Sequence, residues 1–92
     1  MKTATYKCRE GILWLRDSQQ ILVLGPMHNV LCTLREIQAM VWECLVLGYG
    51  YPALLSHLSA LLDIPRDDAG TYLLNLLSSW EQLGIVQREG TA

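Results

Sequence analysis

The stretch VLCTLREIQAMVWECLVLG, residues 30–48, contains the change of pattern that decides the fold. Its first part, Val30 to Leu34, is a short run of apolar and β-branched side chains typical of a strand. From Leu34 onward the apolar positions recur at helical spacing. One face of the predicted helix then carries Leu34, Ile37, Val41, Cys44, Leu45 and Gly48. The stretch therefore predicts a strand that runs directly into a helix of about three turns.

Both ends of this predicted helix carry boundary signals. Thr33 and Glu36 have the spacing of a capping box, in which the two side chains accept hydrogen bonds from N-terminal backbone N–H groups. Gly48 suits the left-handed conformation that ends many helices. We expect the helix to begin close to Leu34 and to end at Gly48.

The residues before this stretch predict a β-hairpin. Two apolar runs, residues 11–16 (GILWLR) and 21–24 (ILVL), flank the polar tetrapeptide DSQQ at residues 17–20. Polar residues of this kind turn a chain between two strands. Residues 1–9 show no regular pattern, and we expect them to form an irregular lead-in.

Two more helices are predicted after Gly48. Pro52 suits the first turn of a helix that ends near Asp63. Its apolar stripe consists of Leu54, Leu55, Leu58, Leu61 and Leu62. A third helix follows Pro65 and runs to about Leu83, with an acidic first turn that the helix dipole favours. Residues 85–88 form a short extended finish.

Strands first and helices afterwards indicate an α+β fold, with three helices on one side of a three-stranded antiparallel sheet. The 92 residues are enough for one core and too few for two. We expect a single domain over residues 1–92, with an ordered core of about 10–88.

Composition narrows the classes of function. Hydrophobic residues make up 51% of the chain and charged residues only 17%, so part of the apolar surface is expected to meet a partner. No apolar run is long enough for a bilayer, and the N-terminus lacks the apolar segment of a signal peptide, so we expect a cytoplasmic protein. The net charge of −2 opposes nucleic-acid binding, which needs clustered Lys and Arg.

The chemistry-bearing residues do not form a catalytic or metal-binding pattern. Cys8, Cys32 and Cys44 are odd in number and lack the short spacings of a zinc site or a disulfide framework. His28 and His57 are not spaced to share a site with an acid. We therefore expect a protein that is not an enzyme and that holds no metal or cofactor.

Over residues 11–88 the chain resembles the PqqD-like family, also described as RiPP recognition elements. Three segments carry the resemblance: HNVLCTL at 28–34, VWECLVLG at 41–48 and LLNLLSSWEQLGIV at 73–86. The chain departs from the family where Leu47-Gly48 replaces the usual Asp-Gly and where Tyr72-Leu73 replaces Asp-Val. Because Tyr72 stands in place of the usual acid, the resemblance does not predict for this chain the polar contact that the acid makes to the peptide. The resemblance implies a winged helix-turn-helix fold.

The resemblance also implies a peptide chaperone. The leader segment of a ribosomally synthesised precursor peptide would lie along the third strand, beside the third helix, and a separate modifying enzyme would act on the precursor. That enzyme would be a radical-SAM enzyme, a leader peptidase or a cyclase. The expected peptide-binding residues are Val30, Leu31, Cys32 and Thr33 on the strand, and Tyr72, Asn75, Leu76, Ser79 and Leu83 on the helix.

Physical reasoning supports both halves of this site. An edge strand offers unpaired N–H and C=O groups to an extended peptide. The sequence leaves open which of Cys32 and Thr33 faces inward, because a one-residue shift in the pairing of the strand would exchange the two side chains. At 100° per residue, the third helix has a core arc and an adjoining stripe that the core does not need. The core arc is Ala69, Leu73, Leu77 and Trp80.

Three alternatives stay open from the sequence. The helix stripe could belong to a wide core face or be buried in a homodimer. The chain could also be a non-catalytic adaptor that scaffolds a larger complex through its apolar surface. A DNA-binding winged helix is disfavoured, because Arg66 is the only basic residue of the third helix.

Overall fold

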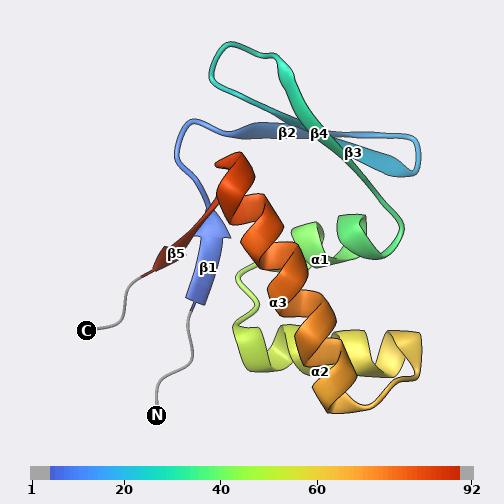
Figure 1. The fold of residues 1–92 in the computed structure, drawn as a ribbon. Helices are drawn as coiled ribbons and strands as arrows, with labels where there is room; N and C mark the ends of the chain where they lie inside the picture. Colours follow the sequence, from blue (N-terminus) through green and yellow to red (C-terminus); the bar gives the residue numbers. More distant parts are fainter. Residues whose placement is uncertain (1–4, 90–92) are drawn as a thin grey trace.

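Three antiparallel strands form a sheet at one end of the molecule (Figure 1). They are β2 (Leu13–Asp17), β3 (Gln20–Leu24) and β4 (Val30–Arg35), in the spatial order β2-β3-β4. The structure is a computed structural model that describes residues 5–89. The predicted hairpin, third strand and α+β class are confirmed.

The strand register determines which face of the sheet meets the helices. Ile21 pairs with Leu34 and Val23 pairs with Cys32, so these side chains point to one face. Ile21, Val23 and Leu34 are almost completely buried there. Leu31 has no partner on β3 and forms a β-bulge between Val30, which pairs with Leu24, and Cys32. Cys32 therefore faces the core and Thr33 faces the opposite side, which settles the facing that the sequence left open.

Three helices lie on one side of this sheet: α1 (Ile37–Val46), α2 (Tyr51–Leu62) and α3 (Arg66–Leu83) (Figure 1). Helix α1 packs against β4, whereas α2 lies at the far end of the molecule from the sheet and packs against α3 and α1. The predicted core arc of α3 is confirmed, since all four of its side chains are at most 2% exposed. Its Trp80 ring meets Trp42 of α1 edge to face, with the ring centroids 5.5 Å apart. No helix in the described part of the chain is long and apolar enough to span a bilayer.

The start of α1 differs from the prediction. The helix begins at Ile37, and Leu34 and Arg35 belong to β4. Leu34 fits both a strand and a helical face, but its pairing with Ile21 extends the sheet. The capping box is wrong: Glu36 is the N-cap residue, with φ 53° and ψ −119°, and no side chain caps the helix.

The predicted end of α1 is confirmed. Gly48 has φ +93°, the left-handed conformation that glycine adopts without strain. Its N–H donates to the Leu45 carbonyl, and the Tyr49 N–H donates to the Cys44 carbonyl, both at 3.0 Å. This is the Schellman pattern, which satisfies carbonyls at a helix end.

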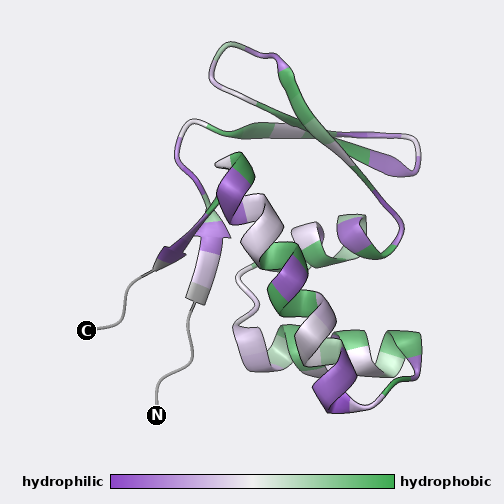
Figure 2. Ribbon diagram, in the orientation of Figure 1, coloured by the Kyte–Doolittle hydropathy of each residue, from purple (hydrophilic) through white to green (hydrophobic). Residues whose placement is uncertain are grey.

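A second, two-stranded sheet corrects the prediction of an irregular lead-in. Strand β1 (Thr5–Cys8) pairs antiparallel with β5 (Val86–Glu89). Tyr6 is 9% exposed and Val86 1%, so the pair closes one end of the core. These two strands are mostly hydrophilic, whereas β2, β3 and β4 are mostly hydrophobic (Figure 2). The polar composition of β1 and its distance from β5 along the chain leave little local signal for this pairing.

We expect Glu36→Gly to raise the free energy of unfolding by about 1 kcal/mol, because the positive φ at Glu36 is strained for a side chain and free for glycine. Urea unfolding of the two proteins measures the difference. Gly48→Ala is the matched control and should lower stability by about 1 kcal/mol. Its added methyl group would meet no atom within 4 Å, so this loss reports the backbone alone. A less stable Glu36→Gly protein would contradict the strain.

Candidate functional site

Strand β4 is an edge of the three-stranded sheet within residues 5–89. The two-residue turn between Asp17 and Gln20 fixes the alternation of the backbone groups. Along β3, successive residues form backbone hydrogen bonds alternately with β2 and with β4. Ile21 and Val23 are the residues that bond β4, so their partners Leu34 and Cys32 direct their N–H and C=O groups toward β3. Thr33 lies between them and directs its N–H and C=O away from the sheet. The free edge of β4 is therefore centred on Thr33.

The predicted strand residues differ in accessibility. Val30 is 56% exposed, and Thr33 is also exposed. Leu31 and Cys32 are half-buried and pack against the core. Val30 and Thr33 are consequently the side chains of this segment that a partner would meet most readily.

The predicted helix residues surround a surface hollow of about 290 Å³. Its lining consists of Gln38 of α1 together with Tyr72, Asn75, Leu76 and Ser79 of α3. Tyr72, Asn75 and Ser79 are exposed, and Leu76 is half-buried. Leu83 is 48% exposed but lies outside this lining. The fold thus brings together four of the five helix residues of the predicted site.

Gln38 connects the hollow to the edge strand. It lies three residues beyond Arg35, where β4 ends, and it forms part of the hollow's wall. None of the predicted strand residues lines the hollow itself. The free edge of β4 leads toward the hollow through the start of α1.

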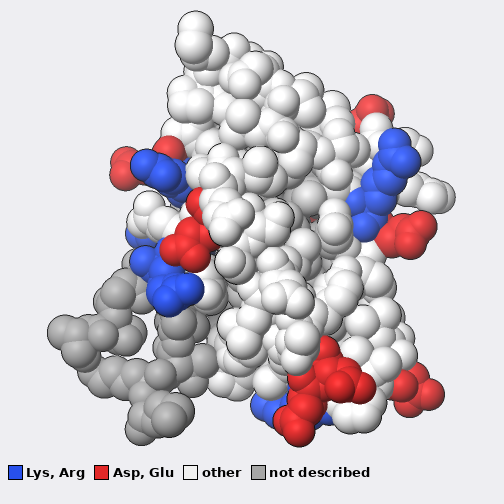
Figure 3. Space-filling model, viewed as in Figure 1, with Lys and Arg blue, Asp and Glu red and all other residues white. Residues whose placement is uncertain are grey.

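The hollow is electrically neutral. Its lining holds two amides, a hydroxyl, a phenol and a leucine, and no charged group. Arg66, the only basic residue of α3, donates to the Ser56 hydroxyl at 2.7 Å, at the far end of the helix. Most of the molecular face with α3 in front carries no charge, and the charged side chains lie toward its margins (Figure 3). Such a surface suits an uncharged or apolar segment better than phosphate groups.

Gln38 is the lining residue that the sequence did not predict. Its position depends on how α1 crosses α3, and no periodicity or motif in residues 30–48 indicates that crossing.

The three thiols are poorly suited to nucleophilic chemistry. Burial raises the pKa of Cys8, Cys32 and Cys44, and the Glu43 carboxylate raises that of Cys44 further. A raised pKa lowers the fraction of thiolate, which is the reactive form. No group of three or more His, Cys, Asp or Glu side chains in the described residues is arranged to hold a metal ion.

Comparison with known proteins adds no relative. No protein-family model matches the chain, and neither the curated proteins nor the solved structures contain a significant match.

Proposed function

We propose that this chain is a peptide-binding chaperone with a PqqD-like, winged helix-turn-helix fold. It recognises the leader segment of a ribosomally synthesised precursor peptide. One observation supports the proposal: the edge strand β4 runs directly into α1, and Gln38 of α1 shares a neutral hollow with Tyr72, Asn75, Leu76 and Ser79 of α3. An extended peptide needs both features, a backbone ladder for affinity and side-chain pockets for specificity.

The peptide adds to β4 as a fourth strand. Its backbone exchanges hydrogen bonds with the outward N–H and C=O of Thr33. Its apolar side chains contact Tyr72, Leu76 and Leu83, and its polar groups meet the amides of Gln38 and Asn75. Most of the binding free energy then comes from backbone bonds and apolar contact.

The chain presents the bound precursor in the cytoplasm to a separate enzyme. The candidates are a radical-SAM enzyme, a leader peptidase or a cyclase. No catalytic role is proposed for this chain, because the pKa values of its thiols are raised by burial. A DNA-binding role is not proposed, because Asp67, Asp68 and Glu81 outnumber Arg66 on α3.

A non-catalytic adaptor is the second candidate. The outer face of the three-stranded sheet favours it, because Leu13 and Leu15 are 47% and 45% exposed there. A scaffold subunit would bury such a face against a larger partner.

We expect Thr33→Pro to weaken peptide binding about tenfold, because proline removes the N–H of Thr33, which faces the peptide at the centre of the edge. The ladder to β3 keeps its bonds, so the fold should remain intact. Isothermal titration with synthetic peptides from short precursor-like reading frames beside the gene measures the affinity. Thr33→Ala is the control and should bind like the wild type, because it retains the N–H. Equal affinity of the proline variant would remove β4 as the binding edge.

A second variant tests the helix side. We expect Tyr72→Asp to reduce the affinity for the same peptide at least about tenfold, because it places a charge in a neutral, partly apolar hollow. Tyr49→Asp is a matched control, since Tyr49 is 40% exposed and Tyr72 is 37% exposed. The proposed hollow would be wrong if both variants bound the peptide equally well.

A further inference from the structure

Among the residues that the structure describes, strand β2 forms the second free edge of the three-stranded sheet, and it differs from β4 in two respects. All five of its residues are exposed, including Leu13, Trp14 and Leu15. Its register with β3 is regular, without the bulge that interrupts β4. A flat, apolar edge strand is a template for pairing with another chain, and natural proteins usually protect such an edge.

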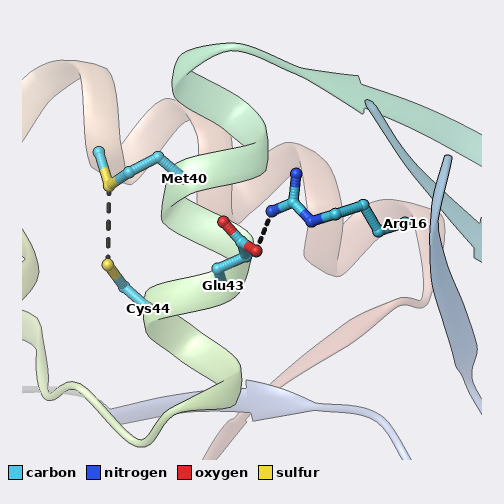
Figure 4. Close-up of polar contacts among 4 residues, drawn as sticks. All are labelled: Arg16, Met40, Glu43 and Cys44. Atoms are coloured by element: carbon cyan, nitrogen blue, oxygen red, sulfur yellow. Dashed lines mark hydrogen bonds and ion pairs between the residues drawn. The ribbon is translucent and has the colours of Figure 1, made fainter. Parts of the chain in front are cut away.

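Strand β2 carries two charged residues, Arg16 and Asp17, and the charge of Arg16 is already balanced. Arg16 of β2 forms an ion pair with Glu43 of α1 (Figure 4). Trp14 and Arg16 pair with Val23 and Ile21, so both side chains lie on the inner face of the sheet. A charge neutralised in this way costs less to bring against a second strand than a solvated one.

Beside Trp14 lies an apolar hollow of about 320 Å³ that continues the exposed surface from β2 onto α1. Its lining is Trp14, Met40, Glu43, Cys44, Val46 and Leu47. Leu47 is 74% exposed and Val46 is 40% exposed. The edge of β2 and this hollow form one apolar surface, separate from the peptide site on β4.

We propose that β2 is a dimer interface, in which the strand pairs antiparallel with β2 of a second copy of this chain about a two-fold axis at Leu15. The central three residues of the strand, Trp14, Leu15 and Arg16, are self-complementary in this register. The axis places Leu15 opposite its own copy and Trp14 opposite Arg16 of the other copy. Each indole ring then meets a guanidinium whose charge is balanced by Glu43, a favourable cation–π arrangement.

The backbone of β2 fits this register. Leu13 and Leu15 direct their N–H and C=O groups toward β3, because Asp17 and Gln20 close a two-residue turn. Trp14 and Arg16 therefore direct theirs to the free edge, where they bond each other across the axis. A centre at Leu15 pairs all five residues of the strand, whereas a centre at Arg16 would oppose two like charges. The dimer joins the two sheets into one continuous six-stranded sheet.

Sedimentation of the full chain over a range of concentrations tests the dimer. We expect a mass twice the 10.4 kDa of the chain at about 100 µM, in the micromolar range expected of a small interface. Leu15→Lys should weaken association at least about tenfold by placing two lysines at the axis. Leu61→Lys changes a leucine of similar exposure on α2, 53% against 45%, and should remain dimeric.

A cysteine at the axis tests the register. Residues opposite each other in a non-hydrogen-bonded antiparallel pair have Cα atoms about 4.5 Å apart, within reach of a disulfide. Leu15→Cys should therefore cross-link to a dimer under oxidised glutathione, which accepts the two electrons. Leu13→Cys, which faces Asp17 of the other copy, should cross-link far more slowly, and the wild-type chain measures the background of its three native thiols.

Three results would overturn the proposal. They are a monomeric wild-type chain at all concentrations, a Leu15→Lys chain that dimerises like the wild type, and faster cross-linking at position 13 than at position 15. The peptide-binding site can fail its own tests without affecting this result, because it lies on the opposite edge of the sheet.

Discussion

The contact between Trp42 and Trp80 is the constraint on which the rest of the structure depends. The two rings are 0% and 2% exposed and meet edge to face at the crossing of α1 and α3. This geometry is favourable for aromatic pairs. The indole nitrogen of Trp42 is buried and has no hydrogen-bond partner within residues 5–89, so the ring is held by its packing contacts.

The same contact sets the position of the proposed peptide site. With Trp80 turned inward, Tyr72, Leu76 and Ser79 fall on the adjoining side of α3. With Trp42 fixed, the start of α1 places Gln38 against that side, and β4 leads directly into α1. The two rings thus fix the crossing of α1 and α3 that forms the hollow, and β4 enters α1 three residues before Gln38.

Local patterns predicted most of the fold, and the errors have a common cause. The β2–β3 hairpin and the core arc of α3 follow from alternation and helical period within a few residues. The pairing of β1 with β5 joins the two ends of the described chain, and no local pattern carries that information. Leu34 satisfied both a strand and a helix pattern, and only its partner Ile21 decides between them. In the site, periodicity indicated the α3 residues. The position of Gln38 depends on the helix crossing, and the facing of Thr33 depends on the pairing of β4 with β3.

The two edges of the sheet are suited to different tasks. The bulge on β4 opposes regular pairing of that strand with a copy of itself, and the proposed peptide site combines this edge with the hollow between α1 and α3. Strand β2 has no bulge and a sequence that complements itself about Leu15. The two proposals therefore assign the peptide to one edge of the sheet and a second copy to the other.

Amide hydrogen exchange of the full chain, with and without a bound leader peptide, tests the central claim most directly. The Thr33 amide faces outward from an edge strand, so it should exchange rapidly in the free protein and become protected when the peptide adds to β4. The amides of Trp14 and Arg16 should not change when the peptide is added, because they lie on the opposite edge. Protection of Trp14 and Arg16 in place of Thr33, with the peptide bound, would contradict the account.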